Sequence, residues 1–171
     1  MENKIKKLVL SAMFLALGMV LPLLTSQVKE IGDSLLPMHF VVLLCGMVCG
    51  GKYGLVVGLV LPYLRSVCFG MPPMYPNAVW MSFELATYGA VVGALYSKLA
   101  KNKVRSVYIS LVVAMVSGRI VWGISKAILM GIAGKAFTIP MFVAGGITDA
   151  LPGIVIQLVL IPVILRLIKR R

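Results

Sequence analysis

The sequence predicts an all-α membrane protein, a six-transmembrane-helix bundle that forms a single domain over residues 1–171. Of the 171 residues, 60% are hydrophobic and 13% are charged, and the mean hydropathy is +1.01. This composition leaves too little polar surface for a soluble domain of the same length. At about 20 residues per span, the chain has room for five to seven helices. No room is left for a soluble catalytic or nucleotide-binding domain.

The charge distribution predicts an orientation in the membrane with both termini cytoplasmic. In that orientation only Lys29 and Lys135 fall in outer segments, while twelve of the 17 Lys and Arg residues fall on the inner side. These twelve are Lys4, Lys6, Lys7, Lys52, Lys98, Lys101, Lys103, Arg105, Arg166, Lys169, Arg170 and Arg171. Such a bias is the usual orientation signal, and it requires an even number of spans. No basic face is interleaved with stacking aromatic residues, so the net charge of +12 predicts no nucleic-acid partner.

Apolar run length places the spans at about 5–24, 36–51, 53–70, 76–97, 106–131 and 149–168. The first follows three lysines, as a secretory signal does, but no small-x-small cleavage site comes after it, so we expect a retained helix. It carries Ala12-x-x-x-Ala16 followed by Gly18, a pattern of small residues that lets another helix approach closely. From these residues alone, packing within the bundle and docking to a partner both remain open. Pro22 is expected to bend or end this helix near its outer mouth.

The second and third helices are predicted to form a close hairpin around a tight inner turn at 50–52. The evidence is the Gly46/Gly50 and Gly54/Gly58 spacing, which brings two glycines to one face of each helix. The fourth helix has small residues at every fourth position, which predicts tight contact with a neighbouring helix. These residues are Ala78, Ser82, Ala86, Ala90 and Ala94.

The last third of the chain is less regular. A long helix is expected over 106–131, and the apolar stretch 131–148 is then broken by glycines and Pro140. This stretch is interpreted as a re-entrant or capping segment. The sixth helix opens with Asp149-Ala150-Leu151-Pro152, where Asp149 is a candidate N-cap.

Five ionisable residues interrupt the apolar runs, and all of them fall in the predicted outer half of the membrane. They are Arg65, Glu84, Arg119, Lys126 and Asp149. Glu84 comes eight residues after Pro76, which puts it about 12 Å below the outer surface. Arg119 and Lys126 are seven apart and therefore share one helix face. Because charge inside a membrane is costly, such residues usually face a wet cavity. Their common depth predicts a pocket open to the outside.

Two interpretations of these charges remain open. In one, Glu84 pairs with Arg119 and Asp149 with Lys126, and the pairs only lock the bundle. In the other, which we prefer, three cations and two anions line a cavity, and a substrate carboxylate or phosphate supplies the missing anion. The candidate substrate-binding residues are Arg65, Glu84, Trp80, Arg119, Trp122, Lys126, Asp149 and His39.

The uncharged members of this set also have plainer explanations. Trp80 and Trp122 offer ring surfaces to a ligand, but interfacial and packing aromatics need no ligand. His39 is a lone histidine, more often a packing residue than a catalyst or metal ligand. The sequence has no nucleophile elbow, phosphate loop or paired metal-ligand helix. Its three cysteines are too few for a disulfide framework or a zinc site. We therefore expect no enzyme activity and no cofactor.

These features together resemble the substrate-binding S components of energy-coupling factor (ECF) transporters, which capture vitamins in prokaryotes. The resemblance rests on the length, six spans with both ends inside, basic inner loops, Ala12-x-x-x-Ala16, and the segments 37–54 and 69–89. It implies an outward-facing pocket under a lid-like first outer loop, in the plasma membrane. It also implies that Ala12 and Ala16 dock on a transmembrane T subunit that carries two cytoplasmic ATPases. Toppling in the bilayer would then deliver the substrate.

The extra positive charge favours a small anionic vitamin, with pantothenate as the first candidate. Pyridoxine and niacin-type ligands stay open. Two functions from other classes also remain. One is a small membrane enzyme that uses Glu84 or His39 as acid or base, and the other is a structural subunit whose charged pairs fix packing.

Overall fold

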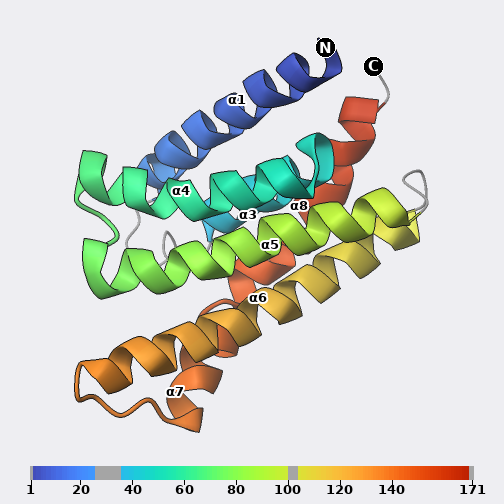
Figure 1. Ribbon diagram of the computed structural model, residues 1–171. Coiled ribbons are helices and arrows are strands. Elements are labelled where there is room, and N and C mark those ends of the chain that lie inside the picture. The colour runs from blue at the N-terminus through green and yellow to red at the C-terminus, as the bar shows by residue number, and fades with distance from the viewer. Residues whose placement is uncertain (1, 26–35, 100–103, 170–171) are drawn as a thin grey trace.

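The protein is an all-helical bundle, as predicted (Figure 1). The computed structural model describes residues 2–25, 36–99 and 104–169. The polar loop that carries Lys29 lies outside them. Within the described residues the long helices are α1 (Glu2–Thr25), α3 (Pro37–Cys49), α4 (Gly51–Phe69), α5 (Val79–Lys98), α6 (Val104–Ile132) and α8 (Leu151–Lys169). The short elements are η1 (Met74–Ala78), α7 (Ile139–Val143) and η2 (Ala144–Thr148).

Five helical stretches of the described chain are long and apolar enough to cross a membrane, and α3 is the short sixth helix. The last of the five runs from Ile139 to Ile168 and therefore includes α7 and η2 as well as α8. At 1.5 Å per residue, the 13 residues of α3 extend for about 20 Å. The hydrocarbon core of a bilayer is about 30 Å thick. α3 is thus too short to cross it alone.

The two ends of the bundle differ in charge. α1 begins and α8 ends at the same end, where the turn between α3 and α4 also lies (Figure 1). This basic end carries Lys4, Lys6, Lys7, Lys52, Lys98, Arg105 and Arg166. At the other end, here named the pocket end, α1, α4 and α6 finish and α3 and α5 begin (Figure 1). The grouping of the termini and basic residues agrees with the predicted arrangement, although their side of the membrane stays a prediction.

Helix boundaries follow from local backbone chemistry. α3 starts at Pro37, whose missing N–H is no loss in the first turn, and Leu36 before it has a left-handed backbone with φ 51°. Gly50, with φ 106°, separates α3 from α4 and makes the predicted tight turn. The expected N-cap at Asp149 is wrong. The first α8 bond runs from Ile154 N–H to the carbonyl of Ala150, which takes the N-cap position.

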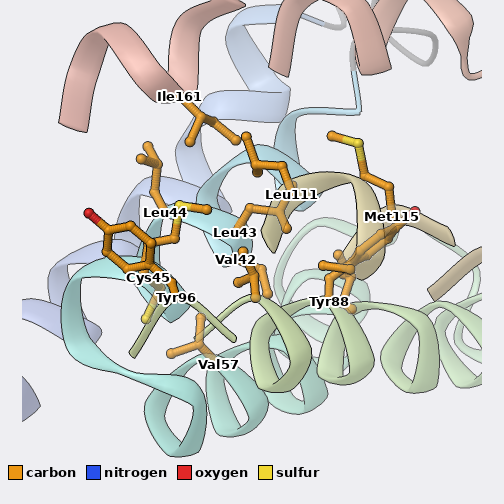
Figure 2. Close-up of a cluster of buried hydrophobic side chains, with 14 of the residues drawn as sticks. Val42, Leu43, Leu44, Cys45, Val57, Tyr88, Tyr96, Leu111, Met115 and Ile161 are labelled. Carbon is orange, nitrogen blue, oxygen red and sulfur yellow. The ribbon is translucent and has the colours of Figure 1, made fainter. Parts of the chain in front are cut away.

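α3 lies at the centre of the bundle and supplies much of its core. Val42, Leu43 and Cys45 are fully buried, and they belong to one cluster with Leu111 of α6 and Ile161 of α8 (Figure 2). Because lipid tails are as apolar as these side chains, close packing rather than escape from water holds such helices together. The core therefore depends on complementary shape.

The closest packing joins three helices at glycines. A Cβ atom built on Gly54 of α4 would lie 2.7 Å from the Cα of Gly46 in α3 and 2.7 Å from the carbonyl oxygen of Gly89 in α5. Real Cβ atoms are not found so close to backbone atoms. The predicted hairpin of α3 and α4 is confirmed here, and α5 completes it. Gly58, by contrast, packs on the backbone of Leu85 in α5.

One position differs from expectation. Gly18 does not share the surface of Ala12 and Ala16, because it lies two residues, or about 200°, beyond Ala16 on the helix. It is buried against Leu61, whereas both alanines are exposed.

The broken segment 131–148 contains helical turns at 139–148 that fold back onto α6 (Figure 1). There Phe142 packs on Gly123.

Candidate functional site

A cavity of about 190 Å³ opens among α3, α5, α6 and η2 at the pocket end. We name it the Glu84 chamber. Its lining residues are Leu36, His39, Trp80, Met81, Glu84, Arg119, Trp122, Gly145, Asp149 and Ala150. Six of the eight predicted substrate-binding residues are thus brought together from separate helices, and Lys126 lies beside two of them. Arg65 is the remaining predicted residue, and it does not line this chamber.

Glu84 is the centre of the chamber's charge. Its side chain is 2% exposed, and its Oε1 lies 3.0 Å from Nη1 of Arg119 and 3.2 Å from Nε2 of His39. The predicted Glu84–Arg119 pair is therefore confirmed. His39, which is equally buried, has an acidic neighbour that is 45 positions away in sequence, and its ring packs edge-on against Tyr88 at 5.3 Å.

Several polar atoms of this trio have no hydrogen-bond partner within the described structure. They are Nδ1 and Nε2 of His39, Oε1 of Glu84, and Nε and Nη2 of Arg119. The two ion-pair distances are short, but the contacts do not have hydrogen-bond geometry. Buried polar atoms are nearly always satisfied in folded proteins. A cluster of unsatisfied donors and acceptors on a cavity wall is therefore suited to holding a polar ligand.

Lys126 is surrounded by aromatic rings. Its Nζ lies 4.6 Å from the ring centre of Trp122, 5.3 Å from that of Trp80 and 5.6 Å from that of Phe137. A cation over ring faces is attracted by their negative charge. The pairing of Lys126 with Asp149 that one interpretation required is not found: no ion pair within 4 Å joins them in the described part of the chain. Asp149 is instead exposed at the chamber wall.

Arg65 lines a second, adjoining cavity of about 310 Å³, which we name the Arg65 pocket. Its walls are Pro22, Leu23, Leu36, Pro37, Met38, His39, Arg65, Phe69, Met71, Pro72 and Met81. Nη1 of Arg65 donates a 2.7 Å hydrogen bond to the carbonyl of Met19 in α1, and the guanidinium lies 5.4 Å from the Phe69 ring centre. Arg65 does not line the Glu84 chamber, because it points toward α1 and lines the adjoining cavity. Around the Glu84 chamber, the two cations Arg119 and Lys126 are balanced by the two anions Glu84 and Asp149.

The structure adds residues that sequence reasoning missed. Gln157 is 2% exposed in α8, and its Nε2 donates a 3.4 Å hydrogen bond to the carbonyl of Leu36, which lines both cavities. An amide within the otherwise apolar run of α8 was the available signal. Phe137 and Phe142 also pack on Trp122, with ring centres 6.1 and 5.9 Å away. Nothing in the broken segment 131–148 pointed to these two rings.

The other candidate site is the outward surface of α1. Ala12 and Ala16 are exposed there, and Val9, Met13 and Leu17 around them are also exposed. The described helices leave this surface uncovered.

These features define the class of the protein: a helical membrane protein with a polar chamber among its helices. A family model described as "ECF transporter, substrate-specific component" matches residues 6–165. The chain therefore belongs to that family, as the sequence predicted. It is a binding subunit of a prokaryotic multi-pass membrane transporter and not an enzyme. No curated protein and no solved structure matches it.

Proposed function

We propose that this substrate-specific component captures a small water-soluble vitamin that carries a carboxylate, with pantothenate as the first candidate. The main support is the trio of His39, Glu84 and Arg119, which line the chamber and whose buried donors and acceptors lack hydrogen-bond partners among the described residues. The hydroxyl and amide groups of such a vitamin would complete these hydrogen bonds. Each bond to a charged group contributes about 1.5–3 kcal/mol.

The charges of the two cavities support an anionic ligand. Arg119 and Lys126 are balanced by Glu84 and Asp149 around the Glu84 chamber. Arg65 in the adjoining pocket adds one positive charge. A monocarboxylate would neutralise the pair of cavities.

The proposal includes the orientation and the partners. The basic end lies in the cytoplasm, so both cavities open toward the exterior. The exposed Ala12 and Ala16 of α1 dock on the T subunit, since small residues allow close helix contact. Two ATPases on the T subunit supply the energy for delivery.

The test is ligand binding by the purified protein in detergent, without ATP. Pantothenate, pyridoxine and nicotinate are added separately, and thermal unfolding is followed. We expect pantothenate to raise the unfolding temperature, with a stabilisation that grows as the logarithm of its concentration above Kd. Arg119→Gln should abolish this shift, whereas Lys135→Gln should keep it, because Lys135 is an exposed cation outside both cavities. A wild-type protein that none of the vitamins stabilises would contradict the proposal.

A further inference from the structure

We propose that the Arg65 pocket is the second compartment of the substrate site and that Arg65 receives the substrate's carboxylate. This inference rests on the proposed function and assigns an orientation to the ligand. The carboxylate would lie beside α1 and α4, and the hydroxyl or amide end would lie in the Glu84 chamber.

The first argument is the charge of Arg65. Arg65 is only 6% exposed, yet no carboxylate within the described structure lies at ion-pair distance from its guanidinium. A guanidinium has five N–H donors, and the described acceptor, the Met19 carbonyl, occupies Nη1. A buried cation without an anion is costly. The remaining donors form a fork that suits a carboxylate.

The second argument is a comparison with the other two cations. Arg119 has the Glu84 carboxylate 3.0 Å away. Lys126 lies over three aromatic rings, and its chamber also contains Asp149. Both therefore have local compensation. Among the described residues, Arg65 has only a carbonyl and the Phe69 ring as partners, so an incoming carboxylate gains most there.

The third argument is that the cavities share a wall. Leu36, His39 and Met81 line both of them, so the two compartments lie side by side, and the proposal places one ligand across this wall. The walls also differ in character. The Arg65 pocket is lined mainly by proline, methionine and other apolar side chains, whereas acidic and basic groups surround the Glu84 chamber. The ligand class that fits is an elongated monocarboxylate with an apolar middle and hydrogen-bonding groups at its far end.

The experiment measures how strongly the protein prefers an acid over its neutral analogue. Dissociation constants are determined by calorimetry for pantothenate and its alcohol panthenol, and for nicotinate and nicotinamide. In the wild-type protein we expect the acid to bind about 10- to 100-fold more tightly than its analogue, the usual effect of a charge-assisted bond. In Arg65→Gln the acid and its neutral analogue should bind about equally. The neutral analogue should keep its wild-type affinity, which shows that the fold is intact. Arg65→Lys should restore part of the preference.

Lys126→Gln is the matched control, because it removes one positive charge beside the other compartment, next to Trp80 and Trp122. It should keep the preference for the acid. If Lys126→Gln loses that preference and Arg65→Gln keeps it, the assignment is overturned and the proposed function stands. The same conclusion follows if the wild-type protein binds acid and neutral analogue equally. If none of the four compounds binds, the proposed function fails and this inference fails with it.

Discussion

At the scale of single residues, the site is organised by one carboxylate shared between two basic side chains. Glu84 Oε1 is within 3.2 Å of both His39 and Arg119. A buried ion pair gains little over apolar packing, but removal of one partner leaves an uncompensated charge at a high cost. The trio is therefore better explained by solute recognition than by stability, and its energetics can be measured.

We predict that Glu84→Gln lowers the free energy of unfolding by roughly 3–5 kcal/mol, because Arg119 loses its counter-ion. The double variant Glu84→Gln/Arg119→Gln should recover much of this loss. Reversible unfolding in detergent over the complete mutant cycle gives the coupling energy. Asp149→Asn serves as the control, since Asp149 is exposed and should change stability by less than about 0.5 kcal/mol. Additive effects of the two substitutions would contradict a direct Glu84–Arg119 interaction.

The sequence predicted these charged residues because a charge in an apolar run is conspicuous and its depth follows from counting residues. Pairing was harder to predict. The pair of Glu84 and Arg119 was one of two open interpretations, and the contact of His39 with Glu84 depends on how α3 and α5 pack. The separation of Arg65 from the Glu84 chamber likewise depends on α1, whose Met19 carbonyl accepts its hydrogen bond. Neither the His39–Glu84 contact nor the separation of Arg65 can be predicted from the spacing of residues in the sequence.

At the scale of helices, the glycines of α3, α4 and α5 set the distance between these elements. The sequence spacing predicted the approach of α3 and α4. It did not predict that α5 enters the same contact through Gly89, because a small residue does not specify its neighbour. The same limit explains Gly18, which was grouped with Ala12 and Ala16 although it faces Leu61.

We predict that Gly89→Ala destabilises the bundle by at least 1–3 kcal/mol, the usual cost of overpacking. The added Cβ would press on the backbone of Gly54, which cannot move aside as a side chain does. Gly131→Ala is the control within a helix, because a Cβ there meets nothing within 4 Å. It should be neutral or stabilising by up to about 1 kcal/mol. Thermal unfolding of both variants tests this contact, and equal stabilities would refute it.

The exposed surface of α1 gives a prediction about partners. Ala12→Trp and Ala16→Trp should abolish vitamin uptake by cells that contain the T subunit and ATPases, because a large ring prevents close helix contact. The purified variants should bind vitamin as the wild type does, since both alanines lie outside the two cavities. Val116→Trp, at an exposed position on α6, should leave uptake unchanged. Loss of binding in the α1 variants would instead indicate a role in folding.

At the scale of the whole molecule, the segregation of cations predicts how the bundle sits in the membrane. We predict that a cysteine at Lys135, near the pocket end, reacts with an impermeant maleimide on intact cells. A cysteine at Lys98, at the basic end, should react only after the membrane is permeabilised. Both side chains are exposed, and the experiment uses a Cys68→Ser background because Cys68 is an exposed thiol. The reverse labelling pattern would overturn the orientation.

The shortness of α3 has a consequence for transport. Its 13 residues extend for about 20 Å of a hydrocarbon core about 30 Å thick, and both cavities lie at the start of the helix. In the proposed orientation, the cargo is therefore held below the exterior face before any ATP is consumed. The rest of α3 is packed into the buried core, so we predict that delivery requires the whole carrier to change its pose rather than a pore to open through it.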